Sequence, residues 1–223
     1  MKKVLILMSI LSIAFHSQSQ DNKVYWTGGG EWIFSFVDAS DGQNEWGSVM
    51  RFSPVFNFQT MANYDLSEHL GIYSGLAVRN VGFIADTEPG TRKKYRTYNL
   101  GIPIGIKIGN MDRMFLFGGY EFDLPFVYKE KTFENEEKTD KAVIWFSDRN
   151  STTMHSLFAG VNFPFGMSLK FKYYLSNFFN QDYSAVIDGT STMPYENVEA
   201  TIFYFSLSFK VFEGKEFYYK EYY

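Results

Sequence analysis

The chain has 223 residues, enough for one domain and short for two, and 20% of its residues are aromatic. It contains no cysteine, which excludes a disulfide framework, a thiol nucleophile and a lipid on an N-terminal cysteine. The formal net charge of −4 argues against a nucleic-acid partner, which would need a basic surface.

The N-terminal segment has the pattern of a secretory signal peptide. Lys2 and Lys3 give a basic start, an apolar run covers 4–15, and Ser17 and Ser19 fit a small-x-small cleavage site. The apolar run is too short to span a membrane as a helix. We therefore predict a signal peptide over 1–19 and a secreted mature chain from Gln20; a buried N-terminal helix is the alternative.

The mature chain repeatedly alternates apolar and polar residues with a period of two, which is the pattern of β-strands. In chain order, the predicted strands are 31–37, 50–60, 70–83, 98–109, 114–126, 153–163, 167–176 and 201–211. The clearest is 98–109, where the even-numbered residues are apolar from Tyr98 to Ile108. We expect a local irregularity at Pro103, because proline cannot donate a ladder hydrogen bond.

Short and long connections alternate between these eight segments. The predicted short turns are Tyr64–His69, Asn110–Arg113 and Phe163–Gly166, and the predicted long polar loops are Asp38–Trp46, Ala85–Lys94, Lys129–Asn150 and Phe179–Asn197. Outer-membrane barrels have short periplasmic turns and longer external loops, whereas a secreted β-sandwich has no reason for this alternation.

The sequence therefore predicts an all-β fold: an eight-stranded antiparallel transmembrane β-barrel over 20–212, followed by a periplasmic tail over 213–223. We expect it in the cell outer membrane, in contact with its lipid. Aromatic residues near strand ends would form the interfacial girdles of such a barrel. They are Trp32, Trp46, Tyr64, Tyr98, Tyr128 and Tyr173.

The predicted register places six basic and three acidic residues on the lumen face of the barrel. They are Glu31, Arg51, Arg79, Lys107, Glu121, Asp123, Lys170, Lys172 and Lys210. The interior of an eight-stranded barrel is about wide enough for its own side chains, and an isolated buried charge is costly. We therefore expect the three carboxylates to pair with Arg51, Arg79 and the lysines, which would close the lumen to solutes.

Features of an enzyme are sparse. The three histidines form no cluster with metal-ligand spacing, and no glycine-rich loop leads into a helix. His155 and Ser156 are adjacent in a predicted strand and point to opposite faces, so they cannot act as a base and its nucleophile. We expect no enzymatic activity, no metal and no cofactor.

Two segments outside the predicted strands could contact a protein partner. The loop 129–150 is dense in charges of both signs and contains an apolar island at 142–146, which could instead extend the next strand. The tail 213–223 alternates tyrosine with lysine and glutamate, a composition able to stack and hydrogen-bond on a partner.

Three stretches together resemble a known family. They are Leu70-Gly71-Ile72-Tyr73-Ser74-Gly75-Leu76, Asn80-Val81-Gly82-Phe83 and Tyr98-Asn99-Leu100-Gly101-Ile102-Pro103. They are similar to the PorT-like outer-membrane β-barrel family, the small "porin family" barrels, and the resemblance covers most of the mature chain. It implies an eight-stranded barrel, and one branch of the family is associated with protein secretion. The chain departs from the pattern at 213–223, which follows the aromatic residue expected to close the last strand.

Three functions follow from these observations. The first is a structural or interaction barrel with a plugged polar lumen, which the charge pattern and the absent catalytic cluster favour. The second is a narrow porin-like channel for small solutes. The third is an outer-membrane lipid-modifying enzyme.

Overall fold

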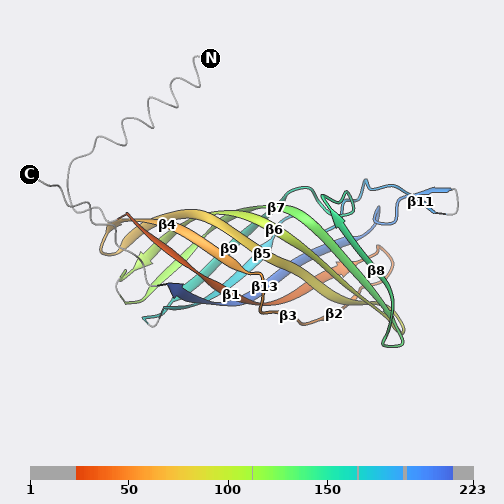
Figure 1. The fold of residues 1–223 in the computed structure, drawn as a ribbon, viewed down its shortest axis with the longest axis horizontal. Helices are drawn as coiled ribbons and strands as arrows, with labels where there is room; N and C mark the ends of the chain where they lie inside the picture. Colours follow the sequence, from red (N-terminus) through yellow and green to blue (C-terminus); the bar gives the residue numbers. More distant parts are fainter. Residues whose placement is uncertain (1–23, 112, 165, 188–189, 213–223) are drawn as a thin grey trace, which may run out of the picture.

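The computed structural model describes residues 24–111, 113–164, 166–187 and 190–212 (Figure 1). The predicted signal peptide over 1–19 and the predicted tail over 213–223 lie outside the described residues. Within the described ranges, no helix is long and apolar enough to cross a membrane.

Eight antiparallel strands form a closed ring. They are β1 (Val24–Ser40), β4 (Phe58–Ser67), β5 (Leu70–Glu88), β6 (Thr91–Gly109), β7 (Phe115–Glu134), β9 (Met154–Asn162), β10 (Met167–Tyr174) and β13 (Glu199–Phe212). Each pairs with the next in this order, and β13 pairs with β1 to close the ring. The prediction of an eight-stranded antiparallel β-barrel is confirmed, and Figure 1 shows its strands running obliquely around an elongated barrel.

Five shorter strands lie outside this ring. β2 (Gly47–Val49) pairs with β5, β3 (Arg51–Ser53) pairs with β1, and β8 (Glu137–Trp145) pairs with the far half of β7. β11 (Ala185–Ile187) and β12 (Thr190–Thr192) form a separate hairpin. β8 and the β11–β12 hairpin lie at the end of the barrel that carries the longer connections, whereas β3 lies against the middle of β1 (Figure 1).

Over most of the barrel wall, side chains alternate between the inside and the outside. In β6, residues with odd numbers from Thr97 to Lys107 are buried, and the residues between them face outward. A Cβ atom at Gly101 would collide with the carboxylates of Glu121 and Asp123, so this glycine makes room for interior charge. Opposite Pro103, the β5–β6 ladder is interrupted between Ser74 and Ala77 without any change of register.

The predicted strand 50–60 is wrong as a continuous element. The chain leaves β3 after Ser53, passes Phe56 with a φ of 61°, and enters β4 at Phe58. Pro54 cannot donate a ladder hydrogen bond, and the Asn57 side chain hydrogen-bonds to the backbone on both sides of this break. The Asn57 side-chain nitrogen donates to the Ser53 carbonyl (2.8 Å), and the Asn57 side-chain oxygen accepts from the backbone N–H of Asn80 (2.8 Å). β4 then runs through most of the segment predicted as the turn Tyr64–His69.

Two predicted loops are largely strand. In place of the loop 85–94, β5 and β6 continue to a two-residue turn at Pro89–Gly90. In place of the loop 129–150, β7 continues to Glu134, turns at Asn135–Glu136 with φ of 48° and 72°, and returns as β8. The Asn135 amide donates to the Gly90 carbonyl (2.9 Å), which ties the two hairpin tips together. The sequences of these extensions do not alternate simply between apolar and polar residues, because their outward faces carry charged residues.

Two aromatic residues assigned to the girdles lie inside instead. The register between β6 and β7 shifts between Tyr98 and Asn99, whose partners are Val127 and Pro125. This extra residue reverses the facing of the chain beyond it, so that Tyr128 is fully buried. Trp46 stacks on Tyr95 (6.4 Å between ring centroids) and packs against the buried cluster at the end of the barrel with the longer connections.

Candidate functional site

The middle of the barrel interior is filled by an ion-pair network centred on Arg79 of β5. Its Nε donates to the Glu31 carboxylate of β1 (2.8 Å), and its Nη1 donates to the Glu121 carboxylate of β7. Nη2 donates to the side-chain oxygen of Gln59 on β4 (2.9 Å). Arg79 is 1% exposed, so this one guanidinium ties four strands together out of contact with water.

Two lysines of β10 complete the network. Lys170 Nζ lies 2.7 Å from Glu31 Oε1, and Lys172 Nζ lies 3.1 Å from Glu121 Oε1 and 2.9 Å from Asp123 Oδ2. The Tyr174 hydroxyl also donates to Asp123 (3.0 Å). The network thus contains three cations and three carboxylates and is electrically balanced, as burial requires.

The remaining lumen residues of the sequence analysis lie apart from this network. Lys107 Nζ donates to Asp65 Oδ1 (2.6 Å) and to the Tyr25 hydroxyl (2.8 Å) near the end with the short turns. Arg51 was expected to pair with a carboxylate, but its guanidinium donates to the side-chain oxygen (2.6 Å) and the carbonyl (3.1 Å) of Asn80. The side chain of Lys210 lies outside the described residues.

Several partners in these contacts were missed by sequence reasoning, among them Tyr25, which precedes the first predicted strand. Gln59 and Asn80 are uncharged, so a search for charge on the lumen face does not select them. Asp65 was placed in a turn, whereas β4 carries it into the wall. Its two-residue spacing from the inward-facing Asn63 was the available signal.

A second layer, made of aromatic side chains, fills the interior toward the end of the barrel with the longer connections. Phe178 and Phe179, from the connection between β10 and β13, are buried among the inward-facing residues of the wall. The Phe178 ring lies 5.2 Å from that of Phe83, and the Phe179 ring stacks on Tyr195 with centroids 4.5 Å apart. Two consecutive phenylalanines beside a polar loop were the sequence signal for this plug.

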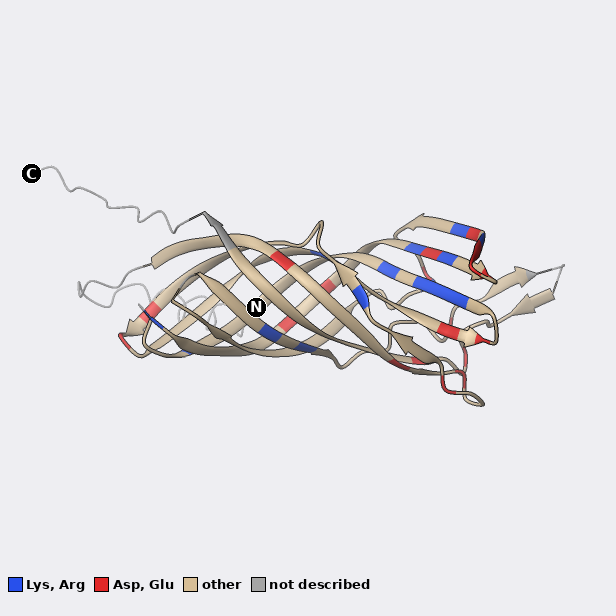
Figure 2. Ribbon diagram, turned by 90° about the horizontal axis from the view of Figure 1, so that it is seen from below, with Lys and Arg blue, Asp and Glu red and all other residues tan. Residues whose placement is uncertain are grey.

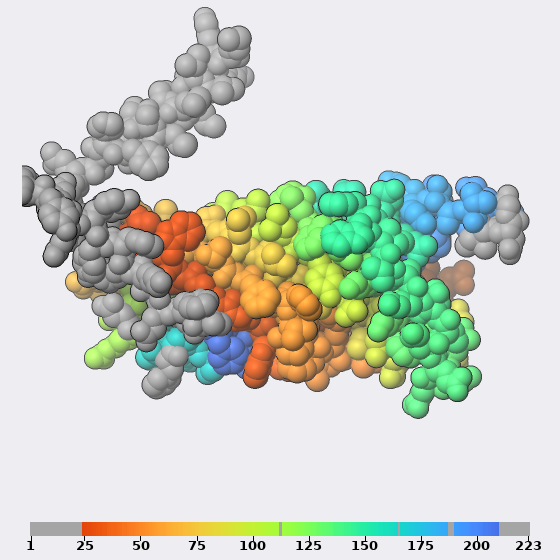
Figure 3. Space-filling model, viewed as in Figure 1, coloured from red at the N-terminus to blue at the C-terminus, as the bar shows by residue number. Residues whose placement is uncertain are grey.

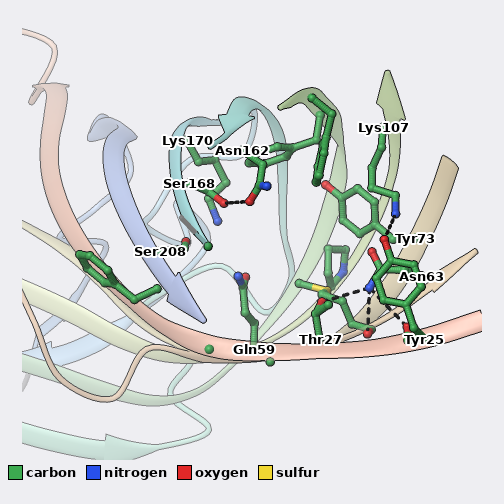
Figure 4. A pocket seen from close by; sticks show the side chains of 18 of the residues that line it. Tyr25, Thr27, Gln59, Asn63, Tyr73, Lys107, Asn162, Ser168, Lys170 and Ser208 are labelled. Atoms are coloured by element: carbon green, nitrogen blue, oxygen red, sulfur yellow. Dashed lines mark hydrogen bonds between the residues drawn. The ribbon is translucent and has the colours of Figure 1, made fainter. Parts of the chain in front are cut away.

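A small cavity remains between the network and the end with the short turns (Figure 4). Its volume is about 130 Å³, room for a few water molecules. Lys107, Tyr25 and Asn63 line one side, and Lys170 and Ser168 line the other (Figure 4). The interior therefore consists of a small cavity with both polar and apolar lining, an ionic layer and an aromatic layer in series.

His155 and Ser156 do not converge on one site. Ser156 is fully buried, and its hydroxyl donates to the Glu121 carbonyl (3.2 Å), whereas His155 faces outward and contacts the Tyr120 hydroxyl. Among the residues that the structure describes, no group of three or more His, Asp or Glu side chains could hold a metal ion.

Comparison with known proteins gives matches among solved structures alone. No protein-family model and no curated protein matches the chain. Ail, the attachment invasion locus protein of Yersinia pestis, is 12% identical with a TM-score of 0.37, over 85% of this chain and 98% of Ail. The same values hold for Ail in complex with the heparin analogue sucrose octasulfate. Neisserial surface protein A (NspA) is 11% identical with a TM-score of 0.39, over 83% of this chain and 96% of NspA.

Proposed function

We propose that the mature chain is a β-barrel of the bacterial outer membrane, that its lumen does not conduct, and that it acts as a structural or interaction protein through its exposed ends. The observation that carries the proposal is the closure of the lumen by two consecutive layers of side chains, one ionic and one aromatic. A solute would have to displace both layers to pass.

The outer wall supports a location in lipid. Every strand of the ring exposes a large apolar side chain, between 42% and 62% accessible. These are Trp32, Phe58, Leu76, Ile104, Leu116, Leu157, Leu169 and Phe205. The outward faces of β6 between Tyr98 and Ile108, and of β7 between Leu116 and Leu124, carry no charged residue. Soluble proteins rarely expose a continuous apolar belt of this kind.

A row of aromatic rings borders the apolar belt. Phe56, Tyr98, Phe126 and Trp145 lie on neighbouring segments of the wall, with successive ring centroids 5.8, 6.4 and 6.2 Å apart. Aromatic side chains favour the interface between lipid and water. This row therefore supports a membrane boundary just below the hairpin extensions.

The proposed orientation follows from the lengths of the connections. The turns after β4, β6 and β9 are short, and β1 begins and β13 ends at the same end of the barrel (Figure 1). We assign this end to the periplasm and the end with the hairpin extensions to the cell exterior. Figure 3 shows the β7–β8 surface, in green, and the β11 region, in blue, at the exterior end.

The exterior hairpins are the proposed contact surface for a protein partner. Within the segment 129–150, the β7–β8 hairpin projects beyond the aromatic row, whereas Val143, Trp145 and Phe146, which are 45%, 66% and 76% exposed, lie at its base beside that row. The tail 213–223 is the second candidate contact. Membership of the PorT-like family, with its link to protein secretion, belongs to this proposal and rests on the sequence resemblance alone.

The proposal assigns no enzymatic activity to the chain. A hydrolase or acyltransferase would need a nucleophile within hydrogen-bond reach of its base. His155 and Ser156 are on opposite sides of the wall, and Ser156 is engaged with a backbone carbonyl.

Single-channel recording tests the proposal. The purified protein, refolded in detergent and inserted into planar bilayers, should give no steady conductance, and its heat-modifiable gel mobility shows that the barrel has folded. Steady conductance that falls when Arg51 or Lys107 is replaced would show that the lumen is a pathway. A mature chain that is monodisperse in water without detergent would contradict the membrane location.

A further inference from the structure

The outward faces of β6, β7 and β8 gather positive charge just beyond the aromatic row. Figure 2 shows several Lys and Arg positions on the extended strands at this end, with Asp and Glu positions among them. We call this surface the basic patch. It consists of Lys94, Arg96, Lys129, Lys131 and Lys141.

Strand register brings these five residues together. Arg96 is paired with Lys129, and Lys94 is paired with Lys131, which is paired in turn with Lys141 on β8. Directly paired residues on one face of a sheet have Cβ atoms about 4.5–5.5 Å apart. Like charges placed this closely repel, and an unrelieved cluster of them destabilises the sheet.

Carboxylates of the same strands do not neutralise the patch. Among the described residues, no salt bridge involves any of its five members. Glu130 is buried on the opposite face, where it accepts from the Tyr128 hydroxyl, and Asp86 is paired with Arg92. Partial burial together with repulsion from Arg96, Lys138, Lys141 and Lys94 lowers the pKa of Lys131.

The aromatic row fixes the height of the patch relative to lipid. Lys129 Nζ lies 4.7 Å from the centroid of the Tyr98 ring, a member of the row, and Lys94 Nζ lies 4.6 Å from that of Phe133. These contacts hold the ammonium groups against the wall. The patch therefore lies at the level where lipid headgroups surround the barrel, facing sideways into them.

We propose that the basic patch binds the phosphate groups of lipid headgroups in the outer leaflet. This inference rests on the proposed membrane location of the barrel. The chemistry is complementary: phosphates neutralise the uncompensated ammonium and guanidinium groups, while the acyl chains of the same lipid lie along the apolar wall below them. A soluble phosphate would supply the first contact alone.

The test measures lipid retained by the folded barrel in detergent, by native mass spectrometry. The probes are diphosphorylated lipid A and its dephosphorylated form. The triple variant K94Q/K129Q/K131Q removes three charges of the patch, K131Q removes one, and R113Q removes one at the opposite end of the barrel. All substituted positions are at least partly exposed, and heat-modifiable mobility checks that each variant folds.

Wild type and R113Q should retain diphosphorylated lipid A equally and retain the dephosphorylated form weakly. The affinity for diphosphorylated lipid A should fall about 5-fold for K131Q and about 100-fold for the triple variant, because each basic residue near the membrane surface contributes a factor of roughly 5. The inference would be overturned if wild type retained both lipids equally, or if the triple variant retained diphosphorylated lipid A as well as wild type does. Displacement of lipid A by millimolar inorganic phosphate would overturn it too. A barrel that fails to insert into neutral phosphatidylcholine vesicles would instead contradict the proposed function.

Discussion

Replacing Arg79 with leucine should be the most damaging single change in the barrel interior. The substitution removes the hydrogen bonds to Glu31, Glu121 and Gln59 and leaves three cation–carboxylate contacts for three carboxylates and two lysines. Removing one partner of a buried ion pair costs about 3–5 kcal/mol. At a urea dependence of about 2 kcal/mol per molar, the unfolding midpoint should fall by about 2 M.

Urea unfolding in lipid vesicles, followed by tryptophan fluorescence, measures this change. The matched control is Arg92→Leu, which removes an arginine whose ion pair with Asp86 is solvent-exposed and should leave the midpoint unchanged. The double variant Arg79→Leu/Glu121→Leu leaves two balanced pairs, Lys170 with Glu31 and Lys172 with Asp123, and should regain part of the lost stability. Equal midpoints for Arg79→Leu and Arg92→Leu would refute the idea that the network holds the interior together.

Two further predictions compare neighbouring or equivalent positions. Lys107→Leu leaves Asp65 without its cation and should lower the free energy of unfolding by about 2 kcal/mol in the same assay. Ile106→Leu exchanges one outward apolar side chain for another and should leave that free energy unchanged. Equal effects of the two substitutions would mean that the strand register is wrong. Gly119→Ala should lower the yield of folded barrel, because a Cβ atom there collides with the backbone of β6. Gly30→Ala is the control, because the nearest atom to a Cβ at Gly30 is 3.9 Å away. Heat-modifiable gel mobility measures the folding of both variants, and a fully folded Gly119→Ala would contradict the close approach of the strands.

Much of the barrel could be predicted because lipid and lumen impose opposite chemistry on alternate residues. The segment 98–108 alternates without a break, and its side chains alternate between the inside and the outside over that whole length in the structure. The same alternation placed Glu31, Arg79, Glu121 and Asp123 on the inner face. Individual pairings could not be predicted, because they depend on which strands lie opposite each other at a given height.

The failures have specific physical causes. One extra residue at the β7 bulge reverses the facing of Tyr128, and no local pattern indicates it. Beyond the apolar belt both faces of a hairpin carry polar residues, so β8 reads as a charged loop. Arg51 hydrogen-bonds to Asn80 of β5 instead of a carboxylate, because it lies on the short strand β3, which ends at Ser53, and not on a continuous strand through 50–60.

The β7–β8 hairpin also has a consequence for association between molecules. Within the described chain, β8 is hydrogen-bonded to β7 along one edge and to no strand along the other. An open strand edge is a template for an added strand from another chain. The edge strand carries Glu137 and Asp140 as well as Lys138 and Lys141, and charged side chains of this kind on an open edge discourage uncontrolled pairing with another chain.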